Sequence, residues 1–398
     1  RQVRIGLSRG ESLDDELTMR IIDRYMLRQF LSTFLICYFS LFGLFVVFDV
    51  FTNLEEFLRY GKTHGSVLGL IGSHYGYRAL LFFDRTAGLI ALVASMFTVT
   101  WIQRHNELTA LMAAGIARTR VAVPVVSAAI AVTGLAAGSR EVVIPRFREP
   151  LSRRPQDILG NVGQPLLPMH DNATEILFRG ERTFSDKQRI SKPDFHLPTP
   201  SPLDRYGQHL IAENAYYRAP TADRPGGYLL RGVSKPADLA DKESLAIDGK
   251  PIVITPRDAP AWLKPSECFV VSDVTFEQLA GGASWREFSS TLQLIRGLRN
   301  PSLDFGADVR VAIHSRLVQP FLDITLLFLG LPLVLRRDSR NVFAAIGLCA
   351  VVVALFMLVT IVCRHLGEIY WVSPAMGAWL PLFLFVPPAV ALSDSMNR

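Results

Sequence analysis

The sequence is poor in cysteine and lacks the motifs of several enzyme classes. Of its four cysteines, only Cys268 lies outside the long apolar stretches, which excludes a disulfide framework and a cysteine-based metal site, and no other metal site is expected. No GxxxxGK[ST] phosphate loop is present, so the chain cannot hydrolyse ATP by a P-loop mechanism. No HExxH, GxSxG or paired-carboxylate motif lies inside the apolar stretches, which argues against an intramembrane hydrolase. We therefore expect no enzyme activity.

Charge is also nearly absent from six stretches, three before residue 140 and three after residue 316. A helix needs about 20 apolar residues to cross roughly 30 Å of hydrocarbon. The stretches that meet this need are residues 30–48, 86–102, 121–139, 317–335, 342–363 and 369–392. The sequence thus predicts a membrane α-helical protein, with helices one to three in residues 20–140 and helices four to six in residues 317–393.

One carboxylate, Asp323, interrupts the fourth apolar stretch. An ionised side chain that faces lipid costs several kcal/mol, so Asp323 is expected to face protein or water. It could pair with Arg316, contact a neighbouring helix or hold a water molecule. A satisfied interhelical hydrogen bond and a role in transport are both open.

Arginines beside the apolar stretches predict the orientation in the membrane. Basic residues in short loops mark the cytoplasmic side. One side holds both termini, including a mobile segment at residues 1–19 and a tail at residues 394–398. The long insert is placed on the other side, and the +6 net charge forms no patch typical of nucleic-acid binding. The cytoplasmic arginines are Arg20, Arg24, Arg28, Arg104, Arg118, Arg120, Arg336, Arg337 and Arg340.

Short alternating segments between Gly, Pro, Asp and Asn clusters fill the insert between helices three and four. This pattern predicts an all-β, jelly-roll-like domain over residues 141–284. A linker helix over residues 285–316 leads back to the membrane, because Phe288, Leu292, Ile295 and Leu298 follow helical spacing after Trp285. The expected strands are residues 175–178, 208–217, 227–233, 251–255 and 268–276.

The loop QRHNELTALMAAGIARTR, residues 103–120, predicts a short amphipathic helix near residues 104–116. Leu108, Leu111 and Met112 follow helical spacing, and Gly115 provides a stop. Two interpretations are open for this helix. It could turn the chain at the membrane surface, or it could dock a partner protein.

Several motifs together resemble the LptF/LptG permeases, also called the YjgP/YjgQ family. They are IIDRYMLRQFL near the first helix, the NELTALMAAG loop, EFSSTLQLIRGL ahead of the fourth helix, and HSRLVQPFLDITLLFLGLPLVLRR within it. The insert is similar only in pattern, through AENAYY and GGYLLRG. The resemblance covers most of the chain and implies six membrane helices with a periplasmic jelly-roll insert.

The resemblance also implies a transport function without a motor of its own. Two such permeases would pair in the bacterial inner membrane above a cytoplasmic ABC ATPase dimer, LptB-like, which would bind the ATP and magnesium. This chain would bind no cofactor. Lipopolysaccharide would be extracted and passed to a single-span, LptC-like periplasmic bridge protein. Glu107 matches the acidic position of the family's coupling helix, and Arg104, Leu108 and Leu111 are expected to support it.

The substrate side would need an apolar cavity rimmed with cations, because arginine binds phosphate bidentately. Asp49, Glu55 and Glu56 depart from such a rim. The alternative function is a membrane-anchored periplasmic β domain that binds a partner or senses lipid without transport, and such a mount needs no docking helix. The candidate rim residues are Arg78, Arg85, Arg140, Arg146 and Arg316, each of which could equally be an ordinary interfacial side chain.

Overall fold

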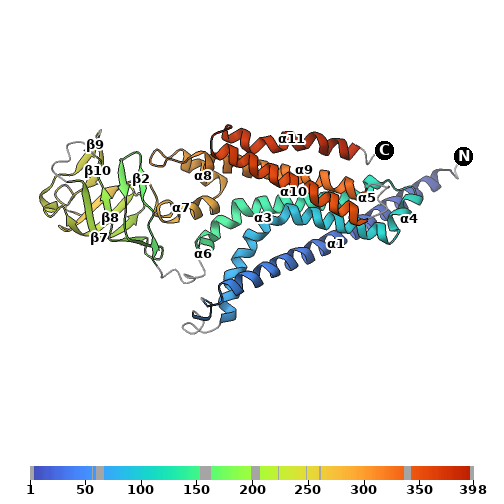
Figure 1. Ribbon diagram of the computed structural model, residues 1–398, viewed down its shortest axis with the longest axis horizontal. Coiled ribbons are helices and arrows are strands. Elements are labelled where there is room, and N and C mark those ends of the chain that lie inside the picture. The colour runs from blue at the N-terminus through green and yellow to red at the C-terminus, as the bar shows by residue number, and fades with distance from the viewer. Residues whose placement is uncertain are drawn as a thin grey trace. The chain divides into compact units, whose positions relative to one another are not determined.

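A computed structural model describes residues 4–55, 57–59, 67–152, 163–198, 207–222, 224–247, 249–259, 261–335 and 342–394. Six helices in these ranges are long and apolar enough to cross a membrane, which confirms the six predicted spans. Glu56, Arg336, Arg337 and Arg340 lie outside the described residues. The membrane helices are α1 (Arg4–Thr52), α3 (Val67–Arg104), α5 (Arg118–Gly138), α9 (Ala307–Leu335), α10 (Val342–Glu368) and α11 (Pro374–Asp394) (Figure 1).

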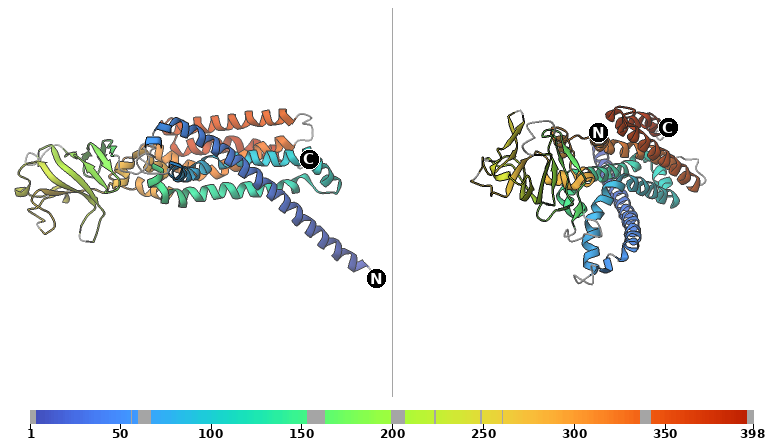
Figure 2. Two further views of the ribbon diagram at one scale, coloured as in Figure 1. Left: turned by 90° about the horizontal axis from the view of Figure 1, so that it is seen from below. Right: turned by 60° about the vertical axis from the view of Figure 1, so that its left-hand side comes forward.

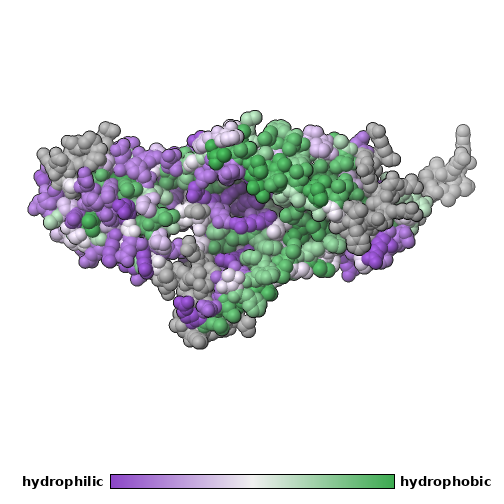
Figure 3. Space-filling view, in the orientation of Figure 1, coloured by the Kyte–Doolittle hydropathy of each residue, from purple (hydrophilic) through white to green (hydrophobic). Residues whose placement is uncertain are grey.

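The chain divides into two compact units. The helical unit comprises Arg1–Leu54, Ile71–Val143 and Gly306–Arg398, and the β unit comprises Glu55–Leu70 and Ile144–Phe305. Hydrophobic residues predominate on the visible face of the membrane helices, whereas hydrophilic residues predominate over the strands (Figure 3). Each unit therefore has the surface that its own surroundings require.

In the helical unit, α9 packs against α5, α10 and α11, and α5 also packs against α1. Val318, Leu322 and Leu326 of α9 are at most 1% exposed and join one apolar core with small residues of α3 and α5. The first helix is different, because only 6% of its apolar window is buried. Its N-terminal part extends past the other helices (Figure 2). The segment expected to be mobile is thus helical from Arg4, and its mobility stays a prediction.

The chain does not stop being helical where the third predicted span ends. After α5 it continues through a π-helical turn, Ser139–Val143, then a 3-10 turn, Ile144–Phe147, and then α6, Arg148–Ser152. A π-helical turn inserts an extra residue and changes the face on which later side chains lie, and such turns are frequent at functional sites. This turn carries Arg140.

The β unit contains one antiparallel sheet, in the order β1-β4-β5-β7-β8-β11-β10-β9, with β2, β3 and β6 joined to it beside β7. This confirms the predicted antiparallel insert between the third and fourth membrane helices. Phe178, Phe195 and Tyr228 are fully buried and contact one another in its core. The strands are β1 (Gln164–Pro165), β2 (Met169–Asp171), β3 (Ile176–Phe178), β4 (Arg182–Phe184), β5 (Arg189–Ser191), β6 (Asp194–His196), β7 (His209–Arg218), β8 (Gly227–Lys235), β9 (Leu245–Ile247), β10 (Lys250–Ile254) and β11 (Glu267–Val271).

The end of the insert differs from the prediction. The strand expected over residues 268–276 ends at Val271, and the single linker helix expected over residues 285–316 is wrong. Instead α7 (Phe276–Phe288) and α8 (Thr291–Leu298) form separate helices, and α9 already begins at Ala307. Both new helix starts have capping boxes, in which a hydroxyl and a glutamine satisfy the first free N–H groups.

The buried face of α8 differs as well. Leu294 and Gly297 are buried, whereas Leu292, which was expected on the apolar face, is 65% exposed. The break before α8 resets the helical phase, because Ser290 caps a new helix rather than continuing α7. The spacing counted across that break therefore placed Leu292 on the wrong face, whereas Phe288, before the break, is buried as expected.

Candidate functional site

The loop between α3 and α5 contains the short helix α4, Glu107–Ala113, which confirms the predicted amphipathic helix. Asn106 starts it in a left-handed conformation, with φ 58°, and Gly115, with φ 86°, turns the chain after it. Leu108 is buried in the core of the helical unit and Leu111 packs against that core. One side of α4 is thus anchored by apolar contacts. The other side is exposed at Thr109, Ala110, Met112 and Ala113.

Glu107 contacts the first membrane helix. The Tyr25 hydroxyl donates to its carboxylate, at 3.0 Å from Oε2 and 3.3 Å from Oε1. Close by in the sequence, Arg120 at the start of α5 pairs with Asp23 of α1 at 2.7 Å. Two polar contacts therefore tie α1 to the segment around α4. Arg104, predicted to support Glu107, is an exposed residue at the end of α3.

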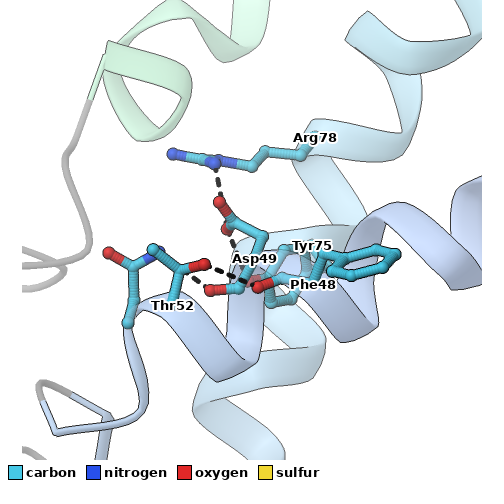
Figure 4. Close-up of polar contacts among 6 residues, drawn as sticks. Phe48, Asp49, Thr52, Tyr75 and Arg78 are labelled. Atoms are coloured by element: carbon cyan, nitrogen blue, oxygen red, sulfur yellow. Dashed lines mark hydrogen bonds and ion pairs between the residues drawn. The ribbon is translucent and has the colours of Figure 1, made fainter.

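A second polar cluster joins α1 to α3. Asp49 accepts a hydrogen bond from the Tyr75 hydroxyl at 2.6 Å and pairs with Arg78 at 3.3 Å through the same carboxylate oxygen (Figure 4). Asp49 had argued against a cationic rim near the end of the first helix. Because Arg78 compensates its charge, that objection is weakened, but Arg78 is also engaged within the chain.

A third cluster lies inside the helical unit around Asp84 of α3. Arg140, carried by the π-helical turn, donates from Nε to Oδ1 of Asp84 at 2.8 Å and to Oδ2 at 3.0 Å. The two side chains are 17% and 11% exposed, so the ion pair is largely buried. Arg316 and Arg85 also act electrostatically on the Asp84 carboxylate. Three of the five predicted rim arginines are therefore gathered around one acidic residue.

The intramembrane carboxylate Asp323 belongs to the same cluster. It accepts a hydrogen bond at 2.8 Å from Gln319, one turn earlier on α9, and Gln319 accepts one at 2.6 Å from Arg364 of α10. The charges of Arg140, Arg364 and Asp84 all act on Asp323. The hydrogen-bonded partner Gln319 lies on the same helix and was not among the expected partners, and it links Asp323 to Arg364 of the neighbouring helix α10.

Together these side chains form what we call the interior charge cluster. Among the described residues it brings four guanidinium groups and two carboxylates together, and Glu368 also acts electrostatically on Arg364. Guanidinium groups in a segment of low dielectric attract anionic groups, and they bind phosphate or carboxylate oxygens bidentately. The members are Arg85, Arg140, Arg316, Arg364, Asp84, Asp323 and Gln319.

The remaining predicted rim residue is not part of this cluster. Arg146 is an exposed residue of the 3-10 turn and belongs to the β unit. The sequence reasoning missed Asp84, Gln319 and Arg364 as site residues. Asp84 and Arg364 lie within two residues of the ends of charge-free windows, so a search for uncharged stretches stops just before each of them. Charges at the edges of such windows are the signal that could have found them.

One protein family matches the chain, through a family model described as lipopolysaccharide export system permease LptF/LptG. The match covers residues 24–179 and 238–394. It includes α4, the interior charge cluster and the six membrane helices except for residues 4–23 of α1. It omits residues 180–237, which contain the AENAYY and GGYLLRG motifs. The comparison with curated proteins found no match.

Proposed function

The chain belongs to the LptF/LptG family of lipopolysaccharide export permeases, and from this premise we propose that it is one permease subunit of an ABC transporter. The complex extracts lipopolysaccharide, or a related glycolipid, from the inner membrane and passes it to a periplasmic bridge protein. A second permease of this type completes the membrane part. A separate cytoplasmic ATPase dimer binds ATP and magnesium and supplies the energy.

The geometry of α4 is the observation that carries this proposal. Leu108 anchors one side of the helix, while Thr109, Ala110, Met112 and Ala113 on the other side are exposed. A passive membrane anchor has no need of such an element, whereas a motor must push on something firmly attached to the membrane helices. The ties from Tyr25 and Asp23 give α4 and its neighbour α5 that attachment to α1.

The substrate enters the proposal through the interior charge cluster. Lipopolysaccharide carries phosphate groups, and arginines in a poorly solvated segment bind phosphate strongly. Asp84 holds Arg140, and Gln319 holds Arg364. We assign Arg140 and Arg364 to recognition of the anionic headgroup of the lipid. Arg85 and Arg316 lie beside them.

The test separates docking from mere support of α4. Tagged full-length chain is purified from native membranes as wild type, Glu107→Arg and Tyr25→Phe. If Glu107 contacts the ATPase, at least about tenfold less ATPase should co-purify with Glu107→Arg than with the wild type, because a cation replaces the carboxylate. A tenfold loss corresponds to ~1.4 kcal/mol of binding free energy. Tyr25→Phe removes only the hydroxyl that Glu107 accepts from, so it retains the ATPase.

Two results would contradict the proposal. If no ATPase is recovered even with the wild type, the anchored β domain becomes the better function. If Tyr25→Phe loses the ATPase as fully as Glu107→Arg, then Glu107 acts by holding α4 and not by contacting the motor. Lipopolysaccharide that co-purifies with the wild type tests the substrate. Thr109→Ala, a small change on the exposed side of α4, serves as the control for recovery of the ATPase.

A further inference from the structure

Three side chains with metal-binding atoms meet on one face of the β unit. Asp194 and His196 are two residues apart on β6, so both lie on the same face of that strand. His209 begins β7 and is directly opposite His196 in the antiparallel register. The intervening Phe195 and Leu210 are fully buried on the opposite face, in the apolar core. The strand pairing itself therefore brings the three together.

The distances between the three groups suit a single small cation. His209 Nδ1 is 2.8 Å from Asp194 Oδ1, and His196 Nε2 is 3.5 Å from Asp194 Oδ2. One ligand atom from each residue lies within 4.8 Å of the others. Zinc bonds of about 2.0–2.2 Å at tetrahedral angles place ligand atoms about 3.3–3.6 Å apart. Shifts of around an ångström, within the reach of side-chain rotation, would complete that geometry.

A second observation points to a missing ligand. His196 Nε2 is buried and makes no hydrogen bond within the described part of the chain. The rings of His196 and His209 lie 4.1 Å apart between centroids. A divalent cation can bind two neutral imidazoles and the carboxylate at once.

We propose that Asp194, His196 and His209 bind one divalent transition-metal ion, for which Zn²⁺ is the probe. Imidazole with carboxylate is a donor set typical of zinc, copper or nickel and not of calcium or magnesium. Three protein ligands leave a fourth position for water or an incoming donor. The three side chains are 29–42% exposed, although the His196 Nε2 atom itself is buried.

The ion would act as a clamp between β6 and β7. β6 is only three residues long and is held by β7 on one side and by a single described pairing to β3 on the other. A metal bond across β6 and β7 adds a strong link to this short strand. The inference does not depend on the proposed transport function, because it rests only on the β unit.

The experiment measures zinc binding by calorimetry on detergent-solubilised full chain, stripped of metal and purified through a tag without histidines. The expected result is one Zn²⁺ per chain. His196→Gln, His209→Gln and Asp194→Asn should each weaken it about tenfold or more, since even outer-shell changes cost about 10–100-fold. His170→Gln is the matched control, because His170 is an exposed histidine of the same unit outside the cluster.

Folding is checked separately, so that a misfolded variant is not mistaken for a lost ligand. Cys268 is fully buried in the core of the β unit, and its thiol must stay protected from maleimide in every variant. Replacement of Zn²⁺ by Co²⁺ should give the visible absorption of a tetrahedral site in the wild type. Absence of bound zinc, or equal affinity in wild type and all three ligand variants, overturns the proposal.

Discussion

A buried ion pair of the helical unit and an exposed ion pair of the β unit place their charges differently, although the β unit also buries the carboxylates of Asp171 and Glu267. In the helical unit the Arg140–Asp84 pair is 17% and 11% exposed, in the interior among the membrane helices. In the β unit the Lys192–Glu181 pair is 76% and 51% exposed, while the interior is filled by Phe178, Phe195 and Tyr228. Charged side chains that face lipid are poorly solvated, so in the helical unit they pack inside the protein, whereas water solvates charges at the surface of the β unit. A buried pair in the first unit and an exposed one in the second should thus differ greatly in energetic importance.

The contrast can be measured in one molecule, because each unit contains buried thiols. Cys349 and Cys363 are buried in the helical unit, and Cys268 is buried in the β unit. Burial also raises the pKa of the Cys268 thiol, which further suppresses its reactivity. Mass spectrometry of maleimide-labelled peptides during heating therefore reports the unfolding of each unit separately.

The largest expected effect is that of Arg140→Ala. It leaves the Asp84 carboxylate without the Arg140 Nε donor that both of its oxygens accept from, and loss of one partner from a buried pair costs about 3–5 kcal/mol. Cys349 and Cys363 should become labelled at a clearly lower temperature, while Cys268 keeps its wild-type midpoint. The measurement is the pair of labelling midpoints.

Lys192→Ala is the matched control from the other unit. Its pair with Glu181 is exposed, and exposed ion pairs contribute little to stability because water and salt screen them. Both labelling midpoints should stay close to wild type. Equal shifts for Arg140→Ala and Lys192→Ala would show that the location of the pair does not decide its importance.

A smaller effect is expected from Gly88→Ala in α3. A Cβ at Gly88 would lie 2.5 Å from the Asp323 Cγ, so the methyl group overlaps the carboxylate that accepts from Gln319. Overpacking of this kind costs about 1–3 kcal/mol. The labelling midpoint of Cys349 should fall.

Two further variants isolate the cause. Gly76→Ala lies in the same helix with no atom within 4 Å of its Cβ, so it should be neutral or slightly stabilising. Combining Gly88→Ala with Asp323→Ala removes the carboxylate with which the new methyl group overlaps. The double variant should therefore be less destabilised than the sum of the two single changes. Strict additivity would mean that the two residues do not meet.

The sequence was sufficient for the membrane helices and for α4, because both depend on local patterns. Charge-free windows predict helices wherever the solvent is apolar, and the spacing of Leu108 and Leu111 before Gly115 predicts a short helix with a stop. The five expected strand segments of the insert overlap β3, β7, β8, β10 and β11, since alternation reflects one buried face, whereas the other six described strands were not among them. These features need no knowledge of distant residues.

The rest depends on contacts that are remote in sequence. Asp84 meets Arg140, and Gln319 meets Arg364, only after the helices have packed, and no local pattern marks these pairs. The π-helical turn that carries Arg140 has no signature in the residues that form it. The division between α7 and α8 was an error of a different kind, because the Ser290 capping box was visible in the sequence and was overlooked.

The smallest expected effect concerns a surface carboxylate of the β unit, Asp258. Hydrogen bonds from the Ser244 hydroxyl and from its backbone N–H, at 2.6 Å for the latter, hold the pKa of this carboxyl below its ordinary value. A lowered pKa in the folded state stabilises the fold above the unfolded pKa of about 3.9, and this contribution is lost as the pH falls through the folded value.

The difference in free energy of unfolding between Asp258→Asn and the wild type should therefore become smaller as the pH falls. Above about pH 5 the difference in free energy of unfolding is constant, and below about pH 3.9 it shrinks. Hydrogen exchange of peptides from β9 and β10, compared between the two proteins at each pH, cancels the intrinsic exchange rates. Asp186→Asn, an exposed carboxylate of another turn, serves as control. A pH-independent gap would show that the Ser244 contact does not act on the charge, and surface charge in this unit would then matter even less than its exposure predicts.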